Sequence, residues 1–176
     1  LPLFKTVNVG DFLFGTDWGP TFTPSTFGVL PIVVGTLSIT FWSLLFAIPI
    51  GILAAIFLVE YGRGRLSRAI SFFVDVMTGI PSIVAGLFIF TAFVLGLGLE
   101  RSGFAAALAL AILMLPVIIR TTEEMLRIVP NDLREASYAL GVPKWRTVIK
   151  VVLPTSLAGI VTGAMLAVAR VAGETA

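Results

Sequence analysis

Residues 29–59 read VLPIVVGTLSITFWSLLFAIPIGILAAIFLV and contain no charged side chain. About 20 apolar residues are enough for a helix to cross the hydrocarbon core of a bilayer, so this stretch predicts a membrane span. Pro49 and Gly51 lie inside it and predict a kink. The composition agrees, because 57% of the 176 residues are hydrophobic and 12% are charged, against about 25% charged in soluble domains. The sequence therefore predicts an integral membrane protein.

Three more apolar stretches follow. Residues 69–98 carry Asp75 and are interrupted at Gly79-Ile80-Pro81-Ser82, which permits either a bend or two helical pieces. Residues 105–119, with a proline near their end, and residues 151–171 predict two further spans. The fold class expected is all-α, a polytopic transmembrane helical bundle with about four spans in this sequence. Residues 1–28 read as a loop whose aromatic residues suit a bilayer interface.

Lysine and arginine gather on alternate loops, which predicts an orientation. Residues 5 and 101 supply the only basic side chains expected on the opposite side of the membrane. Because basic loops stay in the cytoplasm, loops 60–68 and 120–150 are expected inside and loop 1–28 outside. The basic residues of the two inner loops are Arg63, Arg65, Arg68, Arg120, Arg127, Arg134, Lys144, Arg146 and Lys150.

The missing residue types exclude several functions. The chain has no cysteine and no histidine, so it lacks a disulfide framework, a thiolate metal site and the commonest general base. It also lacks a glycine-rich phosphate-binding loop after a strand. We expect no catalytic site, no cofactor and no metal, and we expect that the chain does not hydrolyse ATP itself. A net charge of +2 is too small to indicate a nucleic-acid binder.

Residues 134–154, REASYALGVPKWRTVIKVVLP, form a polar interruption between the last two spans. Asn131 or Asp132 is expected to cap a short helix that ends at Gly141, and Pro143 suits the first turn of a second helix. A helix this short needs packing to be stable, for which we expect an apolar face made by Ala136, Ala139 and Leu140. On these features alone, a juxtamembrane turn explains the segment as well as a docking element does.

The spacing within this segment favours docking. Glu135-Ala136-Ser137, then Gly141, then Val151, Leu153 and Pro154 resemble the EAA motif of ABC importer permeases. Ser137 stands where that motif has its second alanine, and Val151 where it has isoleucine. The resemblance implies a type I ABC importer permease fold. It also implies that these residues form a coupling helix that docks in a cleft of a partner ATP-binding subunit.

Other motifs resemble the phosphate-specific, Pst-type permeases. They are Gly79-Ile80-Pro81-Ser82, Leu115-Pro116, residues 119–124 (IRTTEE), Ala169-Arg170 and residues 173–176 (GETA). The IRTTEE and GETA stretches look more like the PstA branch than the PstC branch, whereas Trp18-Gly19-Pro20 is less typical of PstA. Such permeases have more spans than are present here, so one span is expected before Leu1 and another after Ala176.

Arg170 is the most costly residue of the predicted spans, because an arginine at a span centre is disfavoured by about 2.5–3.5 kcal/mol. It shares a helical face with Gly159, Gly163, Ala167 and Glu174. The two glycines permit close approach of another helix, so Arg170 and Glu174 are expected to project from a tightly packed inner face. Arg170 then either snorkels to the interface with Glu174 as its partner, or lines the path of an anion that its planar fork matches. The family resemblance favours the anion path.

Arg120 closes the third predicted span. Its side chain can pair with Glu123 or Glu124 at helical spacing, whereas the family resemblance makes it a second contact for the anion. Asp75 is expected to pair with a basic residue or to cap a helix piece. Thr78 and Ser82 flank the break of the second span and offer hydroxyl groups.

The resemblance implies the permease subunit of an ATP-driven phosphate importer in a bacterial or archaeal inner membrane, with residues 29–176 forming its permease domain. Its partners would be two ATP-binding subunits, a second, PstC-like permease subunit and an extracytoplasmic phosphate-binding protein. Three different functions stay open. They are a type I permease for another oxyanion or small solute, a channel or carrier that works without an ATPase, and a structural or signalling subunit.

Overall fold

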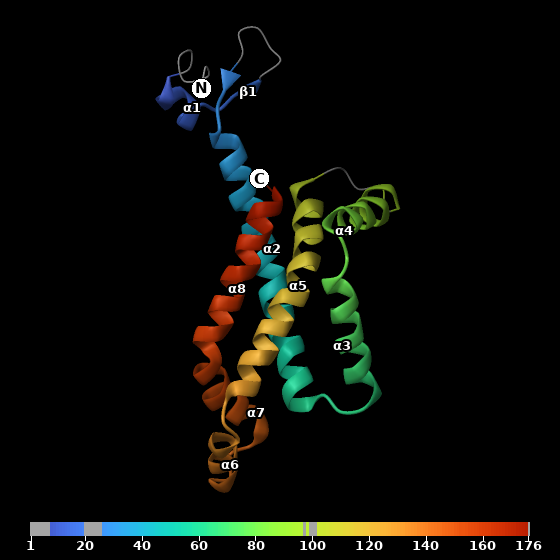
Figure 1. The fold of residues 1–176 in the computed structure, drawn as a ribbon, viewed down its shortest axis with the longest axis vertical. Coiled ribbons are helices and arrows are strands. Elements are labelled where there is room, and N and C mark those ends of the chain that lie inside the picture. Colours follow the sequence, from blue (N-terminus) through green and yellow to red (C-terminus); the bar gives the residue numbers. More distant parts are fainter. Residues whose placement is uncertain (1–7, 20–25, 97, 99–101, 176) are drawn as a thin grey trace.

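The computed structural model describes residues 8–19, 26–96, 98 and 102–175, and almost every described element is helical. A short N-terminal helix, α1 (Val9–Phe14), is followed by strands β1 (Trp18–Gly19) and β2 (Thr26–Phe27), which pair antiparallel with Trp18 opposite Phe27. Figure 1 shows the remaining elements as a bundle elongated along one direction. They are α2 (Leu30–Ile56), η2 (Phe57–Tyr61), α3 (Arg65–Thr78), α4 (Ser82–Ile89), η3 (Phe90–Leu95), α5 (Gly103–Ile128), α6 (Asn131–Ala139), α7 (Lys144–Thr147), η4 (Val148–Val152) and α8 (Leu153–Thr175), where η marks π-helical turns.

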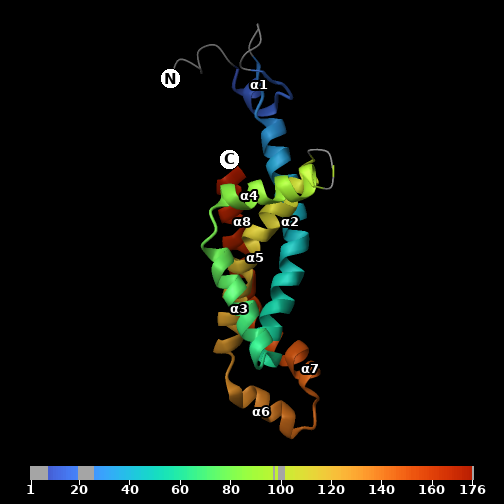
Figure 2. The ribbon, with the colours of Figure 1, turned by 90° about the vertical axis from the view of Figure 1, so that its right-hand side faces the viewer.

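Three helical stretches of the described residues are long and apolar enough to cross a membrane. They are Leu30–Tyr61, Gly103–Ile128 and Lys144–Gly173. The predicted second span is two helical pieces, since α3 and α4 meet at an angle of 109°. Figures 1 and 2 show α3 running beside the bundle and α4 lying across the end at which α5 begins. The break falls at residues 79–81 because Pro81 has no backbone N–H to continue a helix.

Helix α5 is the centre of the bundle, with α2, α3, α4 and α8 in contact with it. One core cluster lies around Ala47, Met114 and Ala167, where α2, α5 and α8 meet. A second cluster lies around Ala55, Leu126 and Val152 and joins the same three parts of the chain further along, with Val74 of α3 packed into it. These two clusters fix the positions of α2, α3, α5 and α8 relative to one another.

Small residues allow α5 to approach its two neighbours closely. A Cβ atom at Gly51 of α2 would lie 2.6 Å from Ile118 Cγ2, so only glycine fits there. A Cβ atom at Gly163 would overlap Thr121, which confirms that the glycines of α8 permit close approach of another helix. Helix α2 continues through Pro49 and Gly51 to Ile56, and the kink expected at that position stays a prediction.

Large apolar side chains cover the outside of the bundle. Leu37, Leu53, Met165 and Phe88 are all exposed on the described chain. Many large apolar side chains exposed on a soluble monomer would promote association. Lipid tails and neighbouring subunits are apolar surroundings that would cover them. The surface therefore agrees with the membrane location predicted from composition.

Two predicted boundaries differ from the observed ones. The third predicted span ends at Ile119, yet α5 continues for more than two further turns to Ile128. The last helical stretch begins at Lys144 rather than Val151 and is continuous through η4 into α8. Much of the region expected as a polar loop, residues 120–150, is thus an extension of the long helices.

Candidate functional site

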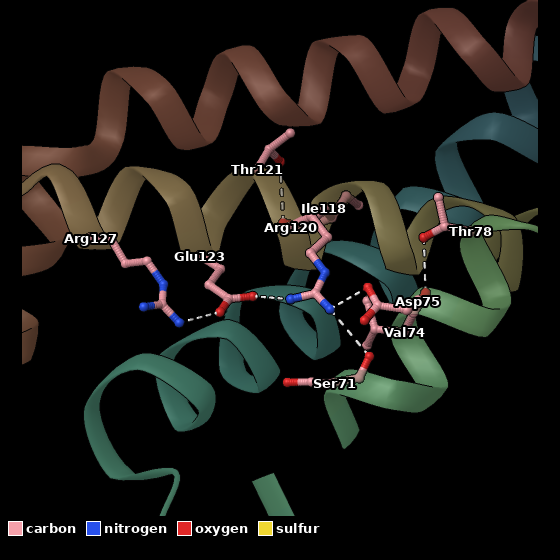
Figure 3. Close-up of polar contacts among 9 residues, drawn as sticks. All are labelled: Ser71, Val74, Asp75, Thr78, Ile118, Arg120, Thr121, Glu123 and Arg127. Atoms are coloured by element: carbon pink, nitrogen blue, oxygen red, sulfur yellow. Dashed lines mark hydrogen bonds and ion pairs between the residues drawn. The ribbon is translucent and has the colours of Figure 1, made fainter. Parts of the chain in front are cut away.

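A chain of four charged side chains joins α3 to α5 (Figure 3). Arg120 of α5 lies at its centre, with Nη2 2.5 Å from Asp75 Oδ1 of α3 and Nη1 2.7 Å from Glu123 Oε2. Arg120 Nη2 also donates to the backbone oxygen of Ser71 at 3.2 Å. Glu123 accepts a second hydrogen bond from Arg127 Nη2, at 2.7 Å. The cluster contains two positive and two negative groups, so it is close to neutral.

Helical spacing accounts for this alignment. Residues 120, 123 and 127 lie three and four positions apart on α5 and therefore share one face. The side chain of Glu123 is 8% exposed, that of Arg120 is 32% exposed and that of Asp75 is 65% exposed. The buried carboxylate is thus surrounded by two guanidinium groups, whereas Asp75 meets Arg120 from the open side.

Two sequence predictions about this cluster are confirmed. Asp75 pairs with a basic residue, and Arg120 pairs with Glu123 at helical spacing. Glu124 is exposed. The Thr78 hydroxyl donates to its own helix at Val74 O. Whether Arg120 also contacts a transported anion stays a prediction.

Arg170 and Glu174 lie on α8 towards the other end of the bundle. The packed face of α8 runs through Gly163, Ala167 and Val171, as Ala167 and Val171 are buried in the core cluster with α2 and α5. Arg170 lies beside that face and is exposed in this chain, so its place on an anion path or at the membrane interface stays a prediction. The side chain of Glu174 lies outside the described residues.

The structure does not bring Arg170 and Arg120 together. Gly163 faces Thr121 across the contact between α8 and α5. Arg170 is seven residues further along α8, which is about 10 Å of helix length. If both arginines contact the same anion, they do so at successive positions along the bundle axis rather than at one site.

The segment that matches the EAA spacing lies at the end of the bundle opposite β1–β2 and the C-terminus (Figure 1). Gly141 has a φ of +77°, and the N–H of Val142 donates to Ser137 O at 3.2 Å. This confirms Gly141 as the left-handed end of a helix. Pro143 directly precedes α7 and does not form part of its first turn.

The expected N-terminal cap of α6 is wrong. Helix α6 already begins at Asn131, after Pro130, and no side chain caps it. Asn131 Oδ1 instead accepts a hydrogen bond from Arg134 Nη1 at 3.1 Å. The same guanidinium donates from Nη2 to Leu126 O at 2.8 Å and from Nη1 to Val129 O at 3.2 Å. Arg134 thus satisfies the last carbonyl groups of α5, which otherwise have no helical partner.

The expected apolar face of α6 does not pack against the described part of this chain. Ala136, Ala139 and Leu140 are exposed, and the Leu140 side chain is among the most exposed apolar groups described. The inner contact is polar instead, since the hydroxyl groups of Ser137 and Thr147 lie 2.8 Å apart in a buried position. Ser137 is one of the two departures from the EAA pattern, and the buried hydroxyl pair gives this departure a structural reason.

The other predicted coupling residues are distributed between the surface and the core. Glu135 is exposed on α6 and Pro154 is exposed near the start of α8. Leu153 packs against the cluster that contains Val152 and Leu126. The segment therefore presents Glu135, Ala136 and Leu140 outward while Ser137 and Leu153 hold it in place.

Sequence reasoning missed Glu60, whose side chain is only 6% exposed. Glu60 Oε1 lies 3.0 Å from Arg134 Nη2, and Oε2 lies 3.8 Å from Lys144 Nζ. Lys144 Nζ also donates to the backbone oxygen of Glu60 and lies over the ring of Tyr61. A lone glutamate between an apolar span and a basic loop was the available signal, because such a group needs a partner if the loop folds back on it.

Comparison with known proteins identifies the family. A model described as "binding-protein-dependent transport system inner membrane component" matches residues 47–176. The chain belongs to this family. All of the network around Arg120 and the whole of α6 and α7 lie within the matched range, so these features belong to the transport domain.

Several curated relatives are named as phosphate transport permeases. The "Phosphate transport system permease protein PstA 1" of Mycobacterium tuberculosis (strain H37Rv) is 54% identical over 149 residues, which are 85% of this chain and 48% of that protein. The PstA protein of Yersinia pestis is 42% identical over an alignment of 179 positions, which covers 99% of this chain and 60% of that protein. The chain thus spans about half the length of the curated relatives it matches.

Solved structures share the fold. An inward-facing form of the MetNI methionine ABC transporter has a TM-score of 0.67 and 27% identity, covering 83% of this chain and 68% of that one. A second crystal form of the same transporter gives a TM-score of 0.68. The fold predicted from the EAA spacing, a helical bundle of the type I importer permease class, is therefore confirmed, and the chain is a multi-pass membrane protein of a transport family.

Proposed function

We propose that this chain is the transmembrane permease subunit of an ATP-driven importer of inorganic phosphate. The observation that carries the proposal is the 54% identity to a PstA phosphate permease over 85% of the chain. A channel or carrier without an ATPase is less well supported, because it gives no role to the EAA spacing or to the exposed surface of α6. The same objection applies to a purely structural or signalling subunit.

The proposed partners follow from the two ends of the bundle. A dimer of ATP-binding subunits would dock on residues 131–147, here named the coupling segment, whose exposed Glu135, Ala136 and Leu140 offer a contact surface. A second, PstC-like permease subunit would complete the path, and a phosphate-binding protein would deliver substrate at the other end. Hydrolysis of ATP would take place in the docked subunits, while this chain moves.

The orientation proposed is that of the positive-inside rule. The start of α3, the helix that opens with Arg65 and Arg68, lies at the same end of the bundle as the coupling segment (Figure 1). That end would face the cytoplasm, and residues 1–28 would form an extracytoplasmic loop. The permease domain is proposed to comprise residues 29–176, with the region 120–150 as its cytoplasmic part.

The proposed anion path runs past Arg170 and Glu174 and then Arg120. Guanidinium groups bind phosphate oxygens through two parallel hydrogen bonds, which suits them to an oxyanion. At Arg120 the entering anion would compete with Asp75, the more exposed of its two carboxylate partners. Closure of the ATPase dimer would displace the coupling segment, and α8, continuous with it through η4, would carry that motion to Arg170.

Transport by the complete chain, reconstituted with its partner subunits in proteoliposomes, tests the proposal. We expect Arg170→Ala to lower ATP-dependent phosphate uptake at least about tenfold, because a hydrogen bond from a charged donor to an anion is worth about 1.5–3 kcal/mol and about 1.4 kcal/mol corresponds to tenfold. Co-purification of the ATPase subunit should be unchanged. Arg63→Ala, which removes an exposed arginine outside the proposed path, is the matched control.

The outcomes separate substrate path from substrate identity. Unimpaired uptake by Arg170→Ala would contradict the assignment of Arg170 to the path. Uptake of sulfate or another solute in place of phosphate by the unaltered transporter would contradict phosphate as the substrate and would favour a permease for another oxyanion.

A further inference from the structure

We propose that Glu60 is a positioning residue that fastens the coupling segment to the first span, so that movement of α6 and α7 reaches α2 as well as α8. The inference rests on the proposed function, because it concerns the transmission of motion from a docked ATPase. Glu60 would act through Arg134 and Lys144 and would not contact phosphate.

Glu60 is a buried charged residue. A carboxylate with a side chain only 6% exposed must be compensated by charge or it destabilises the fold. Both cations that meet it come from the coupling segment, Arg134 from α6 and Lys144 from the first position of α7. The Arg134 contact is an ion pair without hydrogen-bond alignment at Glu60 Oε1. Charge attraction therefore holds the coupling segment to the first span at the Glu60 carboxylate.

Arg134 and Lys144 also bind other groups close to Glu60. Arg134 donates to Leu126 O and Val129 O, at the C-terminal end of α5. Lys144 donates to the backbone oxygen of Glu60 and lies over Tyr61, at the end of η2. The ends of η2 and α5 and both ends of the coupling segment therefore meet around one carboxylate.

The coupling segment is connected to α8 and to α2 in different ways. The coupling segment is continuous with α8 through η4, so one helix already leads from it into the bundle. Helix α2 has no such covalent link, since α3 to α5 intervene in the chain. Separating a buried ion pair leaves uncompensated charge, which is strongly unfavourable. The joint at Glu60 would therefore move as a unit and draw the end of α2 with the coupling segment.

The test compares Glu60→Gln with the unaltered protein in the complete reconstituted transporter. The readout is the number of ATP molecules hydrolysed per phosphate ion transported. We expect this ratio to rise about 2- to 30-fold, the range of coupling changes caused by residues between two sites. A merely structural role would lower hydrolysis and uptake in proportion and leave the ratio unchanged. Glu124→Gln, at an exposed glutamate of α5, is the matched control and should keep the normal ratio.

A second variant covers the case in which Glu60→Gln does not assemble. Lys144→Met keeps the apolar stem of a partly exposed residue and removes only its charge, so it should assemble and should also raise the ratio. An unchanged ratio in whichever variant assembles overturns the role of Glu60 while the proposed function stands. Absence of ATP-dependent phosphate uptake by the unaltered transporter overturns both.

Discussion

The guanidinium of Arg120 has two carboxylate partners in different surroundings. Asp75 comes from α3 and is 65% exposed at the side chain, whereas Glu123 comes from α5 itself and is 8% exposed. Water screens the first pair more strongly than the second, because Glu123 is buried and Asp75 is not. The contact between helices is thus the weaker one, and the contact within α5 is the stronger.

This difference predicts unequal costs of removing each charge. We expect Asp75→Asn to change the free energy of unfolding by less than about 1 kcal/mol, as for other exposed ion pairs. Glu123→Gln should cost about 1–3 kcal/mol, because it weakens partly buried hydrogen bonds to two arginines. Thermal unfolding of the purified variants in detergent measures both, and equal losses would contradict the assigned burial.

Glu60 and Arg134 show what a sequence cannot supply at the scale of single residues. The unusual residues could be recognised, since Asp75, Arg120 and Arg170 are charges in or beside apolar runs. Their partners could not, because pairing between residues 60 and 134, or 75 and 120, depends on which helices lie side by side. The sequence therefore predicts only an unnamed basic partner for Asp75, and it does not single out Glu60.

At the scale of elements, the contact between α5 and α8 depends on glycine. Gly163 faces the β-branched Thr121, whose hydroxyl already donates to Val117 O within its own helix. A threonine held in this way has few other rotamers to adopt. Gly163 therefore fixes how closely the two helices approach.

We expect Gly163→Ala to destabilise the protein by about 1–3 kcal/mol, as for other overpacked positions. Gly35→Ala is the matched control, since a Cβ atom there meets nothing within 4 Å and alanine favours a helix. The control should be neutral or slightly stabilising. Thermal unfolding in detergent compares the two variants, and equal stability would contradict the close packing of α8 on α5.

The helices can be predicted better than their ends. Hydropathy locates all four apolar stretches and the break at Pro81, because these features are local in sequence. It places the end of α5 too early, since Arg120, Glu123 and Arg127 look like loop residues in a linear reading. On one helical face Glu123 pairs with both arginines, and this lets α5 continue beyond the apolar run.

At the scale of the whole molecule, the bent pair α3 and α4 decides the topology. If the pair crosses the membrane, the start of α5 lies on the same side as α1. If the pair is re-entrant, the start of α5 returns to the side on which α2 ends. Figures 1 and 2 show the start of α5 towards the α1 end of the bundle, which favours a crossing.

The absence of cysteine from the sequence makes this question directly testable. Single substitutions Phe14→Cys, Ser102→Cys and Tyr138→Cys place one thiol at an exposed residue of α1, before α5 and on α6. With a maleimide that does not cross membranes, we expect the first two to react in intact cells and the third only after permeabilisation. If Ser102→Cys reacts only after permeabilisation, α3 and α4 form a re-entrant pair, and the proposed cytoplasmic position of the coupling segment is contradicted with it.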